Sequence, residues 1–119
     1  MADQSVSVAD LKERVKEFVH MRDWEKYHNP KDLAESICIE AAELLEIFQW
    51  VSVEKALTFK KDSTKLRRVN EELADVLIYC LSMANAMEIE VSNIIAEKLA
   101  TDSMKYPVEE YRRKEDSEQ

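Results

Sequence analysis

Hydrophobic residues recur every three or four positions along most of the chain, beginning near its N-terminus. The first such stripe consists of Val8, Leu11, Val15, Phe18 and Val19. This spacing places apolar side chains on one face of an amphipathic helix. Ser7 stands just before the stripe, and Asp10 lies three positions after Ser7. Such a pair of residues caps the first turn of a helix. The pattern therefore predicts a helix over residues 8–27.

The same reasoning predicts further helical segments along the chain. Asn29 is a favoured N-cap and Pro30 suits the first helical position, so a second helix begins there. The last helix ends before Pro107, because the residue preceding a proline disfavours helical backbone. The predicted segments cover residues 8–27, 30–50, 53–59, 64–87 and about 92–106. Residues 109–119 are nearly all polar, and we expect this tail to fray.

Composition restricts the fold further. The 119 residues include no glycine and only two prolines. The favoured hairpin turns need residues at positive φ, usually glycine, so we expect an all-α fold, with one domain over residues 1–108. The missing glycine also excludes the P-loop and the dinucleotide fingerprint, in which backbone approaches phosphate closely. If this chain handles phosphates, metal ions and side chains must hold them.

Charge and hydropathy indicate the partners and the compartment. The net charge is −8, which argues against binding to DNA or RNA, since that requires clustered Lys and Arg. No basic leader precedes an apolar segment, and the most apolar stretch, residues 76–87, is too short to span a bilayer. We therefore expect a soluble cytoplasmic protein that binds neither nucleic acid nor membrane. Cys38 and Cys80 are expected to be reduced, buried thiols.

Acidic residues interrupt the apolar face of two predicted helices. On a helical wheel of the second helix, Glu40 falls at the edge of the apolar arc and Glu43 at its boundary, whereas Glu46 points to solvent. On the long helix over residues 64–87, Glu72 and Asp75 repeat the placement of the first two in the same phase. Packed side by side, these helices would bring four carboxylates together.

Four carboxylates in one partly buried place repel one another or are forced to raise their pKa values. A hard divalent cation removes this repulsion, and an all-oxygen ligand set suits Mg²⁺, with Mn²⁺ as the alternative. Mg²⁺ also takes substrate phosphates as ligands, which indicates phosphoryl-transfer chemistry. We expect a carboxylate to take the proton of an attacking water. The expected metal ligands and catalytic residues are Glu40, Glu43, Glu72 and Asp75.

At these residues the sequence resembles the MazG-like branch of the all-α nucleoside-triphosphate pyrophosphatases, and within it the dCTP pyrophosphatases. The family pattern is Glu-x-x-Glu, a spacer and Glu-x-x-Asp, which this chain matches at Glu40, Glu43, Glu72 and Asp75. Short sequence segments on either side of the acidic residues also match the family, namely Arg22-Asp23-Trp24-Glu25, Phe48-Gln49-Trp50, Asp75-Val76-Leu77-Ile78-Tyr79 and Lys105-Tyr106-Pro107. The resemblance covers roughly residues 11–108, nearly the whole predicted helical part.

The resemblance implies a four-helix fold that functions as a homodimer or homotetramer, with the active site completed across subunits. It also implies hydrolysis of a (d)NTP between its α- and β-phosphates, giving the monophosphate and pyrophosphate and clearing unwanted nucleotides from the pool. The chain departs from the dCTP-specific relatives at two positions. They have an asparagine in the fourth helix and a base-proximal histidine in the first, where this chain has Asp102 and Val15. The preferred base therefore stays open.

The same resemblance suggests which residues contact the substrate. The candidates for the base and sugar are Trp24, Trp50 and Tyr79, and those for the phosphates and the remaining contacts are Lys98, Asp102, Lys105 and Tyr106. Aromatic packing is the commoner role of a tryptophan, so both tryptophans could instead belong to the core or an interface. Tyr79 could equally hydrogen-bond a carboxylate. His28, in the turn before the second helix, is expected to face solvent.

Two other functions fit the same residues. Phosphoribosyl-ATP pyrophosphohydrolases use a similar acidic helical site. The tryptophan-containing segments of this chain nevertheless favour dNTPs over phosphoribosyl-ATP as substrates. A non-catalytic helical oligomerisation module would need no metal and would lose nothing on replacement of Glu40 or Glu72. A di-iron carboxylate bundle is excluded, because it needs Glu-x-x-His pairs and no histidine follows either acidic pair at that spacing.

Overall fold

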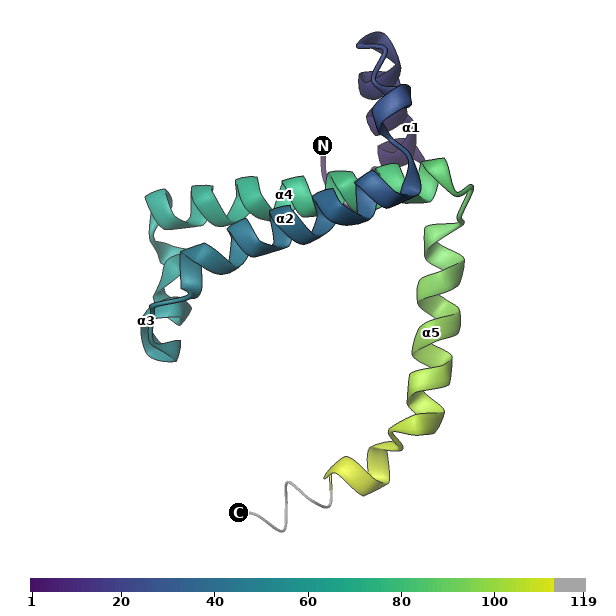
Figure 1. Cartoon of the computed structure of the whole chain (residues 1–119). Coiled ribbons are helices and arrows are strands. Elements are labelled where there is room, and N and C mark those ends of the chain that lie inside the picture. Colours follow the sequence, from purple (N-terminus) through teal and green to yellow (C-terminus); the bar gives the residue numbers. More distant parts are fainter. Residues whose placement is uncertain (113–119) are drawn as a thin grey trace. The chain divides into compact units, whose positions relative to one another are not determined.

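The structure, a computed structural model, describes residues 1–112, and these residues form helices joined by short turns. In chain order the elements are α1 (Val8–Met21), η1 (Glu25–Tyr27), α2 (Pro30–Phe48), α3 (Val53–Leu57), η2 (Thr58–Lys61), α4 (Ser63–Ala86) and α5 (Val91–Lys105), where η marks a 3₁₀ helix (Figure 1). No strand occurs within residues 1–112, so the prediction of an all-α fold is confirmed. The elements divide into two compact units, residues 1–88 with α1 to α4, and a second unit from residue 89 onward with α5.

Helix α1 begins where the sequence predicts but ends earlier. The Ser7 hydroxyl accepts the Asp10 amide at 3.0 Å, and the Ser7 amide donates to the Asp10 carboxylate at 2.9 Å. The prediction of a helix reaching residue 27 is wrong, because Asp23 adopts the left-handed conformation at φ 54°. The Trp24 amide then bonds back to the Val19 carbonyl at 3.1 Å, which caps the end of α1.

Helices α2 and α4 also begin at polar caps. Asn29 Oδ1 accepts the Asp32 amide at 2.9 Å and Pro30 is the first residue of α2, as predicted. Asp62 Oδ1 accepts two backbone amides of the first turn of α4, each at 3.1 Å. Because a cap is a local feature of the sequence, both helices begin within a residue or two of their predicted starts.

The first unit is built around α4. Helix α2 runs antiparallel along it and α1 crosses it (Figure 1). The buried apolar side chains of this core are Val19, Leu33, Ile47, Phe59 and Ala84. The Phe59 ring from η2 lies 5.5 Å from the Phe48 ring at the end of α2. The amide nitrogen of Asn85 donates to the Lys12 carbonyl at 3.0 Å and so ties α4 to α1.

Part of the apolar surface of the first unit is exposed. Helices α1 and α2 and the turn η2 supply the main packing on α4. Four large apolar side chains of α4 nevertheless remain exposed, namely Leu66, Leu73, Leu77 and Ile78. Cys38 and Cys80 are free thiols, as expected, but both are exposed. The expectation that they are buried is wrong, because each lies on a helix side that the packing within this unit does not cover.

In the second unit, α5 covers Val91–Lys105 and ends before Pro107, as predicted. Residues 108–112 form a further helical turn. The rest of the polar tail that was expected to fray, residues 113–119, lies outside the described residues. Within residues 1–112, no helix combines the length and the apolar character that crossing a membrane requires.

Candidate functional site

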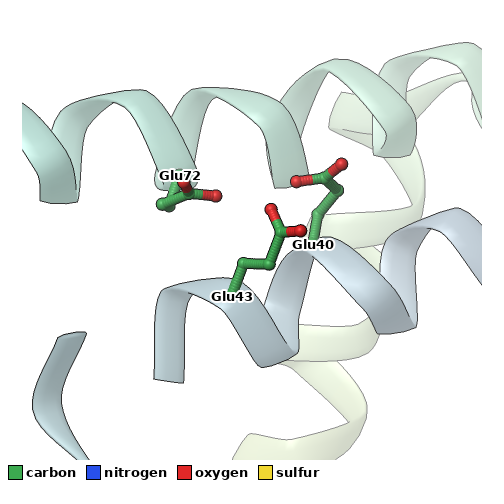
Figure 2. A group of neighbouring side chains, drawn as sticks. All are labelled: Glu40, Glu43 and Glu72. Atoms are coloured by element: carbon green, nitrogen blue, oxygen red, sulfur yellow. The ribbon is translucent and has the colours of Figure 1, made fainter. Parts of the chain in front are cut away.

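Three glutamates from two antiparallel helices converge on one point. Glu40 and Glu43 extend from α2 and Glu72 from α4, and their carboxylates face one another across the gap between the helices (Figure 2). One carboxylate oxygen of each lies within 4.8 Å of the others. The helical phase explains this meeting, since residues three positions apart share a helix side. Glu46, on the other side of α2, is exposed.

Asp75 lies beside this group rather than within it. It is half-buried, one turn after Glu72 on α4. Its negative charge raises the pKa of both Glu40 and Glu72, which shows that it belongs to the same electrostatic neighbourhood. We call these four residues, Glu40, Glu43, Glu72 and Asp75, the acidic cluster.

Burial and repulsion together perturb the acidic cluster. Loss of solvation, followed by the proximity of Glu43 and the other carboxylates, raises the pKa of Glu40 to about 7. The pKa of Glu72 is raised by burial and by Glu43 and Asp75, with the Arg68 guanidinium acting in the opposite direction. The Oε2 atoms of Glu40 and Glu72 are buried and have no hydrogen-bond partner among the described residues.

These features fit a hard divalent cation. The donors are carboxylate oxygens alone, as Mg²⁺ and Mn²⁺ prefer. Buried carboxylate oxygens without a partner are costly, and a cation placed between them would supply the missing interaction. The cluster therefore has the ligand chemistry that the sequence predicts for a metal site.

Tyr79 packs against a residue, His28, that lines a pocket which the sequence does not predict. Its ring stacks against His28 with centroids 6.4 Å apart and an interplanar angle of 30°. His28 is half-buried and its Nδ1 is inaccessible, so the expectation that it faces solvent is wrong. The pocket holds about 170 Å³ and is lined by Val15, Lys16, Val19, Glu25, His28, Ser82, Asn85 and Ala86. Its residues meet only through the crossing of α1 and α4, which no local pattern reveals.

The two tryptophans lie in different surroundings. The Trp24 ring packs edge-on against Phe18 at 5.9 Å, and the Arg22 guanidinium lies 3.6 Å from the Phe18 ring centroid. Trp24 therefore makes an aromatic packing contact, which is the role considered above as the alternative to a contact with the base. Trp50 is 89% exposed just beyond α2, so it is not a residue of the core of this chain.

The remaining substrate candidates lie in the second unit. Lys98 and Asp102 form an ion pair of 3.3 Å one turn apart on α5. The Lys105 ammonium lies 5.4 Å from the centroid of the Tyr106 ring. The structure places these four residues relative to one another only.

The fold and the acidic cluster together define the general class of this protein. It is an all-α protein with a candidate site for a divalent cation. Residues 35–118 match the MazG-like family. The chain belongs to the MazG-like family.

Relatives and a solved structure agree with this assignment. The chain is 31% identical over 102 residues to dCTP pyrophosphatase 1 of Rattus norvegicus, and 29% identical over 101 residues to dCTP pyrophosphatase 1 of Homo sapiens. These alignments cover 86% and 85% of this chain but only 60% and 59% of the relatives. The crystal structure of a pyrophosphatase from Archaeoglobus fulgidus is similar with a TM-score of 0.74 and 42% identity, covering 83% of this chain and 91% of the other.

Proposed function

We propose that the protein is a nucleoside-triphosphate pyrophosphohydrolase, which converts a (d)NTP and water into the monophosphate and pyrophosphate. The names of the relatives, dCTP pyrophosphatase 1, and of the structural neighbour, a pyrophosphatase, support this class of reaction. The observation that carries the proposal is the group of three glutamates whose oxygens lie within 4.8 Å of one another. Such a group binds the cations that accompany a triphosphate.

In this proposal Glu40, Glu43 and Glu72 hold Mg²⁺, or Mn²⁺ in its place, with Asp75 alongside. When bound, the cation neutralises phosphate charge and makes water more acidic, both of which favour hydrolysis. The carboxylates fix the position of the cation between α2 and α4, and one of them accepts the proton of the attacking water. Burial raises the pKa of Glu40 to about 7, and a nearby cation opposes this effect by favouring the charged form.

Residues outside the acidic cluster are proposed to hold the nucleotide. The base and sugar contacts are assigned to Trp24, Trp50 and Tyr79, and the phosphate and remaining contacts to Lys98, Asp102, Lys105 and Tyr106. The exposure of the Trp50 ring supports a contact with a molecule outside this chain. In a chain with a net charge of −8, the ammonium groups of Lys98 and Lys105 supply local positive charge that favours the approach of a triphosphate.

We further propose that the chain works as a four-helix homodimer or homotetramer in the cytoplasm, where it removes unwanted nucleotides. The exposed leucines of α4 support this assembly, because contiguous apolar surface marks a protein interface. The order of long helices, α1, α2, α4 and α5, supplies the four elements of such a subunit.

A substrate panel tests the reaction. The purified protein is incubated with Mg²⁺ or Mn²⁺ and each of the common dNTPs and NTPs, and with phosphoribosyl-ATP. We expect stoichiometric pyrophosphate and nucleoside monophosphate from at least one dNTP, and none after chelation of the metal. Hydrolysis of phosphoribosyl-ATP alone would replace the proposal by that activity. No pyrophosphate from any substrate would leave a non-catalytic module.

A matched pair of variants tests the site. Glu40→Gln removes one carboxylate of the acidic cluster and should lower kcat/KM for pyrophosphate release by at least ~100-fold, since even the outer partners of metal ligands are worth about 10- to 100-fold. Glu46→Gln makes the same chemical change on the exposed side of α2 and should leave the rate unchanged. Equal rates for the two variants would contradict the assignment of the site.

A further inference from the structure

The turn that follows α1 places a cation against two aromatic rings. The central carbon of the Arg22 guanidinium lies 3.6 Å from the centroid of the Phe18 ring and 5.9 Å from that of the Trp24 ring. The two rings meet edge-on, with centroids 5.9 Å apart and an interplanar angle of 70°. Arg22 also donates from Nη1 to the Phe18 carbonyl at 3.0 Å, so a hydrogen bond holds the guanidinium in the stack. We call Phe18, Arg22 and Trp24 the aromatic stack.

The backbone of this turn brings Trp24 back against the last turn of α1. Asp23 adopts the left-handed conformation at φ 54°, which reverses the chain at the end of the helix. The Trp24 amide then donates to the Val19 carbonyl at 3.1 Å. A residue other than glycine in this conformation is strained, and such strain recurs at functional sites. The turn fixes the backbone of Trp24, and the aromatic stack is left to fix its ring.

The aromatic stack lies at the surface rather than in the core. Phe18 is 49% and Trp24 is 41% exposed, and Arg22 is also exposed. Burial of the two rings therefore accounts for only part of the arrangement. An arginine that both stacks and donates a hydrogen bond loses little freedom for each contact it makes. The open part of the indole is consequently held in one orientation.

The turn is anchored on the side of α4 that carries Asp75. The Tyr27 amide donates to the Trp24 carbonyl at 2.9 Å, which joins the turn to η1. The next residue, His28, stacks on the Tyr79 ring with centroids 6.4 Å apart. Tyr79 follows Asp75 by one helical turn, and residues four positions apart share a helix side. The aromatic stack therefore precedes by only a few residues a direct contact beside the acidic cluster.

A ring that is already oriented binds a nucleobase more tightly than a mobile one. Nucleobases stack on the faces of aromatic side chains. A side chain that must be ordered during binding loses rotamer freedom, which weakens the affinity. Because Arg22 restricts the indole of Trp24 before any ligand arrives, it removes part of this loss.

We propose that Arg22 is a positioning residue, which acts through the aromatic stack to hold the Trp24 indole ready to stack on the base of the substrate. The proposal rests on the pyrophosphohydrolase function and on the assignment of Trp24 to the base, both proposed above. The planar guanidinium carries the effect, because an ammonium in its place has the same charge but no face to stack on the Phe18 ring.

The kinetic test compares Arg22→Met, which keeps an unbranched side chain without the charge, with Arg22→Lys, which keeps the charge. Arg14→Met is the control, since Arg14 is an exposed arginine of the same helix. Rates of pyrophosphate release are measured for the best dNTP and for 2-deoxyribose 5-triphosphate, which has no base. Both Arg22 variants should raise KM for the dNTP about fivefold with kcat nearly unchanged. They should leave kcat/KM for the baseless triphosphate unchanged, and Arg14→Met should match the wild type for both substrates.

Fluorescence measures the ring directly. In a Trp50→Phe background, Trp24 is the only tryptophan of the chain, so time-resolved anisotropy without nucleotide reports the motion of its indole. Arg22→Met and Arg22→Lys should increase the amplitude of the fast motion, whereas Arg14→Met should not. A merely structural role of Arg22 at the end of α1 would lower the melting temperature and leave this motion unchanged.

The outcomes separate the two proposals. If the wild type releases pyrophosphate but Arg22→Met changes the dNTP and the baseless substrate equally, or changes neither, the positioning role is overturned and the pyrophosphohydrolase stands. Wild-type rates and anisotropy in Arg22→Lys would likewise overturn the role of the planar stack. If the wild type releases pyrophosphate from none of the triphosphates, both proposals are overturned. Should the wild type cleave the dNTP but not the baseless triphosphate, the inhibition constant of the latter replaces its rate in the comparison.

Discussion

At the scale of single residues, the carboxylate of Glu40 is half-buried among three others, and loss of solvation with their repulsion raises its pKa from 4.5 to about 7. A folded-state pKa above the unfolded value means that the folded protein binds more protons between these two values. In the absence of metal, the contribution of Glu40 to stability is therefore largest below about pH 4.5 and is lost as the pH rises through 7. Ionisation of Glu40 destabilises the metal-free fold.

This linkage predicts how a neutral side chain behaves. Without metal at about pH 8, Glu40→Gln should unfold at a higher urea concentration than the wild type, and at about pH 5 the difference should shrink or vanish. Urea titrations of both proteins in EDTA at the two pH values measure this. Glu46→Gln, on the exposed side of α2, provides the control and should follow the wild type at both. A stability difference that does not change with pH would show that Glu40 is not held in a charge-repelling environment.

The affinity for Mg²⁺ should depend on pH in the opposite direction to the stability of the metal-free protein. Protons and the cation compete for the carboxylate of Glu40, whose pKa lies near neutrality, so the affinity for Mg²⁺ should increase between about pH 6 and 8. Isothermal titration of the protein with MgCl₂ across this range measures the affinity. The release of protons on binding, seen as a dependence of the heat on the buffer, should accompany it. An affinity independent of pH would argue against Glu40 as a ligand.

At the scale of the helices, the chain ends α1 and α4 without any glycine. Asp23 and Glu88 both occupy the left-handed region at φ 54°, where a side chain is disfavoured by about 1–2 kcal/mol. Aspartate tolerates this conformation better than glutamate does. The end of α4 is therefore the more strained of the two.

Glu88→Gly should relieve this strain and raise the free energy of unfolding by about 1 kcal/mol, since glycine is the favoured residue after a helix end. Glu88→Ala removes the same carboxylate but keeps a Cβ, so it should give little or no gain. Chemical denaturation of the two variants and the wild type compares them. An equal gain for alanine would trace the effect to charge rather than to backbone conformation.

The predictability of these elements follows from how local their causes are. Ser7 and Asn29 cap their helices through contacts within the first turn, so the sequence predicts both starts. The end of α1 depends on Asp23 adopting a conformation usually reserved for glycine, and the expected extension to residue 27 fails there. The convergence of Glu40 with Glu72 could be predicted from helical phase, because the two helices lie side by side.

Other parts of the site depend on tertiary packing and could not be predicted. Ser82 looks like one polar residue in an apolar stretch until α1 crosses α4 beside it. His28 looks like a turn residue until the Tyr79 ring covers it. The exposure of Cys38 and Cys80 has the same origin, since a helical stripe shows which side is apolar and not what covers it.

At the scale of the whole molecule, the exposed leucines of α4 fit the proposed assembly of subunits. Leu73 is 44% and Leu77 is 53% exposed, and the two lie one turn apart on the same side. A contiguous apolar surface of this kind is typical of a subunit interface. If the chain assembles through this side of α4, a charge placed there should separate the subunits.

Leu77→Glu should convert the assembled protein to a smaller species at micromolar concentration, because a buried unpaired carboxylate is costly at an interface. Leu77→Met, which keeps an apolar side chain of similar volume, should retain the assembly. Sedimentation velocity of the three proteins measures the change. Retention of the wild-type mass by Leu77→Glu would place the interface elsewhere.

The unpartnered carboxylate oxygens between α2 and α4 have a practical consequence for protein engineering. A library selected for heat resistance alone, in buffer containing a chelator, would enrich neutral replacements of Glu40 and Glu72, since these relieve the repulsion. The most robust clones from such a selection would be inert. Any selection for greater thermal stability must therefore measure the turnover rate together with the melting temperature in each round.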